Sequence, residues 1–484
     1  MGKSNTVIPS LLWKAGERMI VQGLNLLVQV ILARLLMPED FASLAIIAAI
    51  VNYLGLFVQS GLSVAVVQKS NLTSKDIATL TTISLLAALV MYIGLFFAAP
   101  VISNYYDVGD LVLPIRLMGV TLFLFAFNSI QTGLLQRKMQ FRTIFFRSML
   151  ATPISGIIGI TMAYLGYGIW ALIAFNISNT LIIVLFMNMI PELRLKLGFS
   201  LQSAKELYSF SIKILGTSLV SAGGDTVRTL TIGKHFNANQ LAYFDRGLSY
   251  SGLVTQVVNT SLSSVMLPVL SRQQEDMSSL RDMVRKSVGM SSFLMVPVLV
   301  MIAVVSEPLV RIILSEKWVP CAIYLSLFCL LRMPGIITSI DKQAYYALGK
   351  SQIGLYYEIF LLAVNLISLF FMLDYGVLAI AIGFVVVEYL GNFVLFIVSE
   401  KVYHYTLKDR FLDLFKPVLS SIVMVVCMYS LTFILKNSFV LLVSQIVLGA
   451  LSYLIISVFL KDKNMIYIRE KIRSLIGKKS ETHI

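Results

Sequence analysis

Charged residues are scarce in this sequence, and those present are unequally divided between the two signs. They make up 13% of the 484 residues, whereas hydrophobic residues make up 57%. Because a soluble domain carries about 25% charged residues, this composition excludes an ordinary soluble globular fold. The chain is therefore expected to be an all-α protein that crosses a membrane many times.

Cysteine and histidine are also rare. The three cysteines, Cys321, Cys329 and Cys427, lie within apolar stretches, which excludes a disulfide framework or a CxxC metal site. The three histidines are far apart in the chain and offer no metal-ligand spacing. We therefore expect neither a metal site nor a cofactor.

The motifs of common enzymes are missing. No nucleophile elbow and no plausible carboxylate pair is found, and Gly349-Lys350-Ser351 lacks the glycine that a phosphate-binding loop requires at position 344, which is alanine. We therefore predict that the protein is not an enzyme. The amino terminus has no pattern of a cleaved signal peptide, so we expect it to be retained.

What the sequence does contain is a series of apolar stretches long enough to cross a bilayer, which takes about 20 residues. They are joined by short loops that leave no room for a soluble domain. We predict fourteen transmembrane helices near residues 11–36, 41–68, 77–103, 111–135, 144–166, 168–190, 207–236, 241–268, 284–305, 321–345, 353–373, 377–399, 414–435 and 439–460.

Lysine and arginine indicate the orientation, because loops on the cytoplasmic side carry the excess of these residues. With a cytoplasmic amino terminus, most of the 39 basic residues fall in cytoplasmic segments. The other side holds only Arg34, Lys234, Arg311, Lys317 and Lys436. The pattern predicts that both termini are cytoplasmic. The net charge of +14 is then a topology signal and an attraction to anionic lipid, and it requires no nucleic-acid partner.

The two halves of the chain resemble each other. A shift of 200 positions places Gly23 on Gly223 and Asn25 on Asp225, and a shift of 208 places the segment 165–171 on 373–379. Such repeats in membrane proteins are typical of transporters that bind their substrate between the halves. We predict an amino-terminal lobe of six helices (1–200), a carboxy-terminal lobe of six (201–405), two further helices (406–460) and a tail (461–484).

Polar residues follow one face of the first helix of each lobe. Their spacing of three and four residues places them on one side of a helix, and we expect the two stripes to face each other across a central cavity. The stripe residues and a further arginine that we predict to bind substrate are Arg18, Gln22, Asn25, Lys213, Ser221, Arg228 and Arg246. For Arg228 the alternative is an ion pair with Asp225 on the same helix.

Four acidic residues are expected at membrane depth: Glu17, Asp225, Glu358 and Glu388. Ionisable residues at this depth are rare and usually functional. We predict that the last three are candidates for coupling transport to protons or sodium. The basic tail, in which isoleucine and leucine alternate with lysine and arginine, is predicted to form an amphipathic helix on anionic lipid of the cytoplasmic leaflet.

The sequence resembles the bacterial polysaccharide flippases of the Wzx type in the MOP superfamily, within the colanic-acid exporter branch. The resemblance extends over nearly the whole chain. It is most specific in residues 267–276 (LPVLSRQQED), in Leu280-Arg281 and Pro297, in residues 32–36 (LARLL) with Phe41, and in Ser315-Glu316-Lys317-Trp318. Ser315 departs from the family pattern, which has glycine at this position.

The resemblance implies two six-helix lobes with two extra carboxy-terminal helices, and movement of a polyprenyl-diphosphate-linked oligosaccharide across the bacterial inner membrane by alternating access. A polysaccharide polymerase or glycosyltransferase complex is a possible partner. Two alternatives stay open: a multidrug or organic-cation antiporter of the same superfamily, and a membrane-embedded polymerase or glycosyltransferase. An antiporter of cations calls for an acidic cavity, whereas here the basic residues at membrane depth outnumber the acidic ones.

Overall fold

The computed structural model describes residues 7–59, 66–67, 69, 71–106 and 111–470, and these residues form helices and turns without any strand. Within the helices, the side chains of some residues, including those of Arg18 and Lys213, lie outside the description. Each of the fourteen predicted apolar stretches coincides with helix over most of its length. Eleven helical segments of the described chain are long and apolar enough to cross a bilayer. The protein is therefore a multi-pass helical membrane protein.

Helices α1, α9 and α10 are not among these eleven segments. They are also the helices on which the predicted substrate-binding residues lie. The total of fourteen membrane-spanning helices therefore stays a prediction. The described chain divides into two compact units, residues 1–245 and 246–484, so that α10 begins in unit 1 and continues into unit 2.

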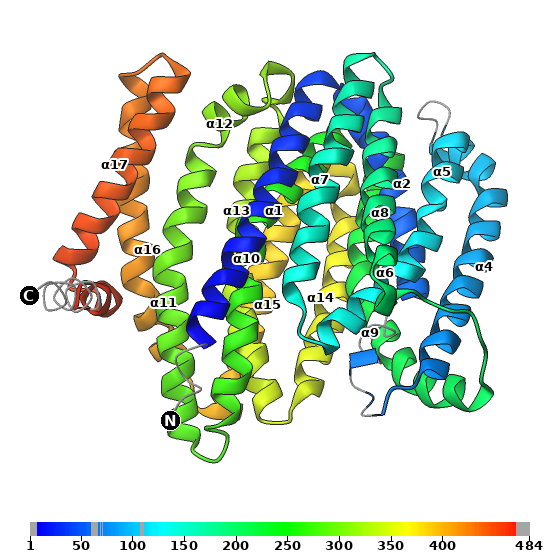
Figure 1. Ribbon diagram of the computed structural model, residues 1–484. Helices are drawn as coiled ribbons and strands as arrows, with labels where there is room; N and C mark the ends of the chain where they lie inside the picture. The colour runs from blue at the N-terminus through cyan, green and yellow to red at the C-terminus, as the bar shows by residue number, and fades with distance from the viewer. Residues whose placement is uncertain (1–6, 60–65, 68, 70, 107–110, 471–484) are drawn as a thin grey trace, which may run out of the picture. The chain divides into compact units, whose positions relative to one another are not determined.

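Unit 1 is built from α-helices (Figure 1). In chain order they are α1 (Val7–Leu35), α2 (Pro38–Gln59), α4 (Ser74–Tyr106), α5 (Val112–Gly119), α6 (Thr121–Arg137), α7 (Phe141–Tyr164), α8 (Ile169–Met189), the 3-10 turn η1 (Pro191–Leu193), α9 (Leu201–His235) and the start of α10 (Ala238–Ser271). Helices α5 and α6 are separated at Val120, directly after Gly119, and together form one apolar segment, Val112–Arg137, that corresponds to the predicted stretch 111–135.

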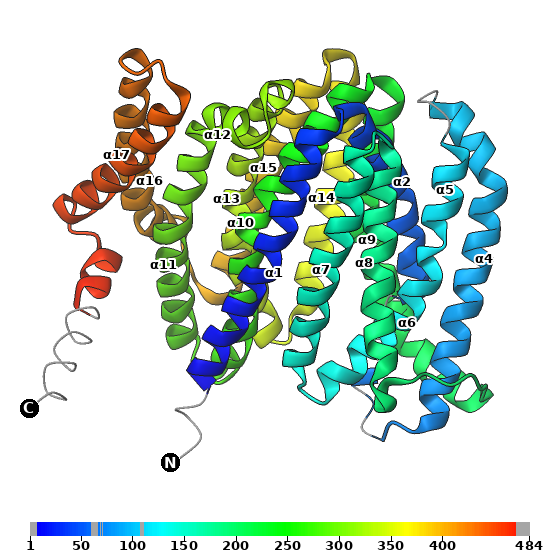
Figure 2. The same ribbon diagram turned by 45° about the horizontal axis from the view of Figure 1, so that its top comes forward.

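Small residues allow the helices of unit 1 to approach closely. Gly156 of α7 lies against Val28 of α1, and a Cβ atom built at Gly156 would be 2.6 Å from the Cγ2 atom of that valine. Helix α7 also packs along α8, and the two lie side by side in both views (Figures 1 and 2). Because lipid and leucine are equally apolar, such close backbone packing is a main source of helix association in membranes. The position of Gly156 therefore fixes the contact between α1 and α7.

Unit 2 contains the rest of α10, α11 (Met277–Val304), α12 (Ser306–Ile313), η2 (Glu316–Trp318), α13 (Cys321–Ala347), α14 (Ser351–Met372), η3 (Leu373–Tyr375), α15 (Val377–Tyr403), α16 (Leu407–Ser430), η4 (Leu431–Phe433) and α17 (Ser438–Phe459). Helices α11, α13, α14 and α15 pack against one another. The predicted pair of carboxy-terminal helices, α16 and α17, forms a hairpin whose buried side chains pack on α11.

The tail prediction falls mainly on residues 471–484, which lie outside the described chain. The described beginning of the tail packs on unit 2, because Met465 and Ile468 lie against the cluster that contains Phe293 and Met424. Lys416 donates a hydrogen bond to the carbonyl oxygen of Lys461 at 3.0 Å. The start of the tail is therefore held by the protein, and contact of the remainder with lipid stays a prediction.

Candidate functional site

The polar stripe of α9 contains a buried arginine. Arg228 is 7% exposed and forms an ion pair with Asp225 at 2.7 Å, three residues earlier on the helix. Its guanidinium also lies 5.6 Å from the ring centroid of Phe244. The carboxylate of Asp225 is 73% exposed, and Ser221, one turn earlier, is exposed as well. The ion pair considered as the alternative for Arg228 is therefore present, although its acidic member remains largely open.

The stripe of α1 is described only in part. Gln22 and Asn25 are half-buried, whereas the side chains of Arg18 and, on α9, Lys213 lie outside the description. Helix α1 packs on α7, and α9 packs on α2 and α4. The facing of the two polar stripes across a cavity stays a prediction. Arg246, also half-buried, is on α10 at the first residue of unit 2.

The structure brings together two of the predicted coupling residues. Glu358 of α14 forms an ion pair with Lys342 of α13, and Glu388 of α15 interacts electrostatically with Lys342, Glu358 and Arg332. The ring of Tyr357 lies 5.3 Å from the ammonium group of Lys342. Three helices of unit 2 therefore contribute to one cluster of opposite charges. Asp225, the third predicted coupling residue, belongs to unit 1.

Sequence reasoning missed the role of Lys342, because its charge was used only to assign the cytoplasmic side of the membrane. The structure places it within α13, five residues before the helix ends at Ala347. The available signal was the predicted helix 321–345, which already contains Lys342, and Gly349 with a φ of +70° marks the turn that follows. Lys342 precedes that turn and belongs to the helix.

A second network was not predicted at all. Asp341 and Arg410 are 0% and 1% exposed, and they form an ion pair at 2.9 Å between α13 and α16. Tyr403 donates a hydrogen bond from its hydroxyl group to the same oxygen of Asp341 at 2.6 Å. The guanidinium of Arg410 lies 4.3 Å from the ring centroid of Phe396 and 4.2 Å from that of Tyr405.

This network continues toward α11. Tyr405 donates a hydrogen bond to Asp413 at 2.9 Å, and Asp413 accepts another from Arg285 of α11 at 2.9 Å. Burial, followed by the proximity of Asp413, raises the pKa of Tyr405, so the phenol remains a hydrogen-bond donor. The network therefore links α11, α13 and α16 through charged and phenolic groups.

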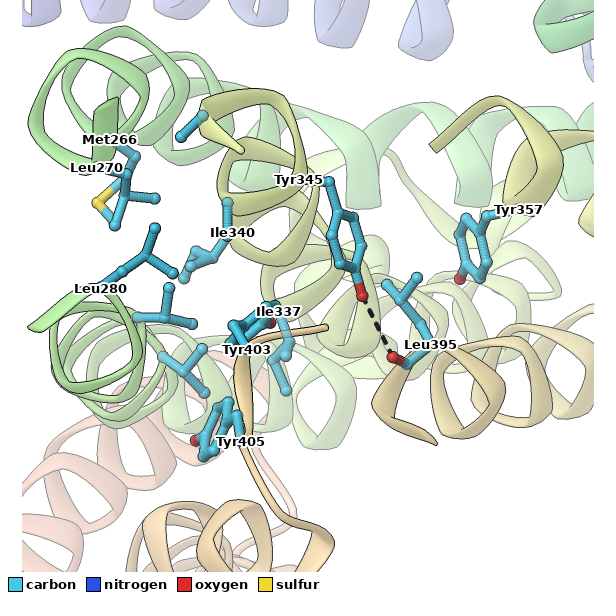
Figure 3. Close-up of a cluster of buried hydrophobic side chains, with 14 of the residues drawn as sticks. Met266, Leu270, Leu280, Ile337, Ile340, Tyr345, Tyr357, Leu395, Tyr403 and Tyr405 are labelled. Atoms are coloured by element: carbon cyan, nitrogen blue, oxygen red, sulfur yellow. Dashed lines mark hydrogen bonds between the residues drawn. The ribbon is translucent and has the colours of Figure 1, made fainter. Parts of the chain in front are cut away.

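The network adjoins an apolar cluster shown in Figure 3. Tyr403 and Tyr405 belong to this cluster with Leu280 of α11 and Ile337 of α13. Tyr345, also of α13, donates a hydrogen bond to the carbonyl oxygen of Leu395 at 3.4 Å, the dashed line of the figure. Apolar packing and buried hydrogen bonds thus hold the same helices, which indicates a stiff region of unit 2.

The family-like segment 267–276 has a structural explanation. It closes α10 and begins α11, where Asp276 caps the helix by accepting hydrogen bonds from the backbone N–H groups of Ser278 and Ser279 at 3.0 and 3.1 Å. The hydrogen bond from the Ser278 hydroxyl, together with that from Ser279, lowers the pKa of Asp276 below its ordinary value. The same hydrogen bonds that cap the amino-terminal end of α11 therefore also favour the ionised form of the carboxylate.

Ser315, the departure from the family pattern, adopts a φ of 103° and a ψ of 171°. This conformation is almost restricted to glycine, because it brings a Cβ atom too close to the backbone. The conformation explains why a glycine at this position suits the fold. No group of three or more His, Cys, Asp or Glu that could hold a metal ion occurs among the residues described.

Taken together, the described helices carry buried cations and a polar charge cluster within apolar segments, which is the pattern of a membrane transporter. The fold resembles that of a solved structure, "Lipid II flippase MurJ, inward closed conformation", with a TM-score of 0.76, 19% identity, and coverage of 93% of this chain and 99% of that chain. The inward-facing structure of a multidrug resistance MATE family transporter of the MOP superfamily has a TM-score of 0.63 and 15% identity, and the match covers 80% and 97% of the two chains. At these identities the likeness establishes the fold.

Sequence comparison identifies the family to which this chain belongs. Residues 31–323 match the polysaccharide biosynthesis protein family, and the chain belongs to that family. Among relatives, the succinoglycan biosynthesis transport protein ExoT of Rhizobium meliloti (strain 1021) is 21% identical over 349 residues, covering 72% of this chain and 70% of its own length. The resemblance is therefore confirmed at the level of the polysaccharide biosynthesis protein family.

Proposed function

We propose that this protein is a flippase that moves a polyprenyl-diphosphate-linked oligosaccharide across the bacterial cytoplasmic membrane by alternating access. The observation that carries the proposal is membership of the polysaccharide biosynthesis protein family over residues 31–323. The named function of the ExoT relative, transport in succinoglycan biosynthesis, supports the same substrate class. The fold shared with a lipid II flippase supports the mechanism.

The chemistry of the substrate fits the polar helices. A diphosphate requires cations that form charge-assisted hydrogen bonds, and sugars require hydroxyl and amide groups. Arg18, Lys213, Arg228 and Arg246 supply the first kind of group, and Gln22, Asn25 and Ser221 supply the second. The exposed carboxylate of Asp225 offers Arg228 a counter-ion that an arriving diphosphate can displace.

The charge cluster of unit 2 suits a coupling role. Glu358 pairs with Lys342 and Glu388 interacts electrostatically with both, so gain of a proton or cation by one carboxylate changes the interaction of the other with the lysine. We assign coupling to these two residues and keep Asp225 as a third candidate. The lobes 1–200 and 201–405 and helices 406–460 complete the proposed architecture, with both termini in the cytoplasm.

The multidrug antiporter of the same superfamily is the second candidate, because the MATE structure has a similar fold. The buried cations of unit 1 disfavour it. Arg228 and Arg147 are 7% and 8% exposed, and a cationic drug would be repelled by such groups. An assay with an organic cation and an assay with a lipid-linked oligosaccharide separate the two functions.

The test is flipping of a fluorescent polyprenyl-diphosphate oligosaccharide in vesicles that contain the purified full chain. We expect transport of the oligosaccharide and none of an organic cation. Arg228→Glu should abolish transport, because it replaces a buried cation with an anion. Arg311→Glu is the matched control, since Arg311 is 36% exposed and pairs with Glu307 at 3.0 Å on α12. Transport of the cation alone would reject the proposal.

A further inference from the structure

Three cations are buried in the described part of the chain: Arg147, Arg228 and Arg410. Arg228 has Asp225 at 2.7 Å and Arg410 has Asp341 at 2.9 Å. Arg147, which is 8% exposed, has no carboxylate within 4.0 Å among the residues described. Because a buried charge without a counter-ion costs several kcal/mol, this arginine requires an explanation.

The protein holds one edge of the Arg147 guanidinium with neutral groups. Its Nη1 atom donates hydrogen bonds to the Oδ1 atom of Asn128 at 3.0 Å and to the hydroxyl oxygen of Thr132 at 2.9 Å, both on α6. The buried Nε atom finds no acceptor within the described chain. An arginine binds phosphate through two parallel N–H groups, so the edge that contains Nε remains available for such an interaction.

The position of Arg147 along its helix points to the bilayer surface. Helix α7 begins at Phe141, so Arg147 lies about 9 Å from the helix start at 1.5 Å per residue. The headgroup region occupies about 5 to 8 Å on each side of the hydrocarbon core. Helical side chains are directed toward the amino-terminal end, which brings the guanidinium toward the level of lipid phosphates.

The charges nearby favour an anion at this position. Arg142, five residues closer to the start of α7, is exposed, and its guanidinium lies 5.4 Å from the ring centroid of Phe146. Lys138, by contrast, is already paired with Glu192 at 2.5 Å. The α6–α7 end of unit 1 thus presents one exposed and one buried guanidinium without a carboxylate partner among the residues described.

We propose that Arg147, held by Asn128 and Thr132, is a binding site for a phosphoryl group at the bilayer surface. The group comes either from the diphosphate of the carrier lipid or from an anionic phospholipid, and only the first form rests on the proposed function. A site that must release its ligand benefits from neutral partners, because a permanent carboxylate would compete with the phosphoryl group. This explains why Arg147 differs from Arg410.

The test is binding to the purified full chain in phosphatidylcholine nanodiscs, measured by native mass spectrometry with two probes. One probe is a polyprenyl diphosphate without sugar, and the other is phosphatidylglycerol. Arg147→Gln should weaken binding of at least one probe about tenfold to hundredfold, the effect of a lost charge-assisted hydrogen bond. Arg116→Gln is the control, because this half-buried arginine of the same unit donates instead to the carbonyl oxygen of Phe96.

A second variant keeps the test decisive if Arg147→Gln does not fold. Asn128→Asp places a carboxylate oxygen where the amide oxygen now lies, so it should raise the melting temperature and weaken binding of the same probe at least tenfold. A rise in stability with unchanged binding of both probes would mean that Arg147 only joins α6 to α7, and would overturn the proposal.

The two probes also identify the source of the phosphoryl group. Loss of polyprenyl diphosphate binding alone assigns the site to the carrier lipid, and loss of phosphatidylglycerol binding alone assigns it to the phospholipid. Flipping by the wild-type protein is measured in parallel. If the wild-type protein does not flip the lipid-linked oligosaccharide, the proposed function fails, and the phosphatidylglycerol titration still decides the role of Arg147.

Discussion

Replacing Ser315 with glycine is expected to stabilise the protein. The residue has a φ of 103° and a ψ of 171° and makes no capping hydrogen bond through its side chain. A non-glycine residue in this region costs about 1 to 3 kcal/mol. Glycine loses about 0.4 to 1 kcal/mol more on folding because its unfolded chain is freer. The net gain for Ser315→Gly is therefore roughly 0 to 2.6 kcal/mol, or about 1.3 kcal/mol at the midpoints of the two ranges.

The chain contains a matched control for this prediction. Gly376 adopts nearly the same conformation, with a φ of 93° and a ψ of 170°, and an added Cβ atom there would meet nothing within 4 Å. Gly376→Ser should therefore destabilise the protein by a similar amount through the backbone alone. Both lie in unit 2 at the residue before a helix.

The assay is thermal unfolding of the purified protein in detergent, followed by intrinsic fluorescence. We expect Ser315→Gly to raise the melting temperature by about 1 to 4 °C, and Gly376→Ser to lower it by a similar amount. A lower melting temperature for Ser315→Gly, or no effect of either substitution, would refute the argument from backbone strain.

Three further predictions concern packing and topology. Asp341→Asn and Arg410→Met should each lower the free energy of unfolding by about 3 to 5 kcal/mol. The double variant should lower it by much less than the sum of the two single effects, as measured by a double-mutant cycle in mixed micelles. Gly247→Ala should lower the melting temperature, because its Cβ atom would lie 2.8 Å from the backbone nitrogen of Leu325, while Gly335→Ala, with nothing within 4 Å, should not. Reporter fusions should indicate a cytoplasmic position after Lys69, Lys196, Lys350 and Lys463, and the opposite side after Asp107, Asn237 and Asp374; inversion at two or more would reject the topology.

The helices could be predicted because each one is an apolar run closed by a turn signal. Gly166 and Gly376, for example, have positive φ values of 81° and 93° and end or begin helices where the sequence indicated turns. The interruption at Val120 was missed, since Gly119 was the only local signal and the apolar run continues through it. Apolarity predicts that a segment is buried or spans a membrane, but it does not predict where the helix breaks.

The pairing of charges could not be predicted from the sequence. Asp341 and Arg410 are 69 residues apart, and Lys342 and Glu358 are 16 apart on different helices. The positive-inside rule assigned Lys342, Arg410 and Arg147 to one side of the membrane, which is a statement about position and not about partners. The partners depend on helix packing, which no local pattern contains.

The three buried arginines differ in the partners that the protein gives them, and this difference determines how easily each can accept another anion. Asp341 is 0% exposed, so it holds Arg410 in a low-dielectric environment where exchange with another anion would require opening of the helices. Asp225 is 73% exposed, and water screens its attraction for Arg228, so this ion pair is easier to exchange for another anion than that of Arg410. Arg147 has only neutral partners and gives up no ion pair when an anion arrives. We infer that Arg410 contributes to the rigidity of unit 2. The two buried arginines of unit 1 have weaker interactions with the protein, which an anion can replace when it binds and which form again when it leaves.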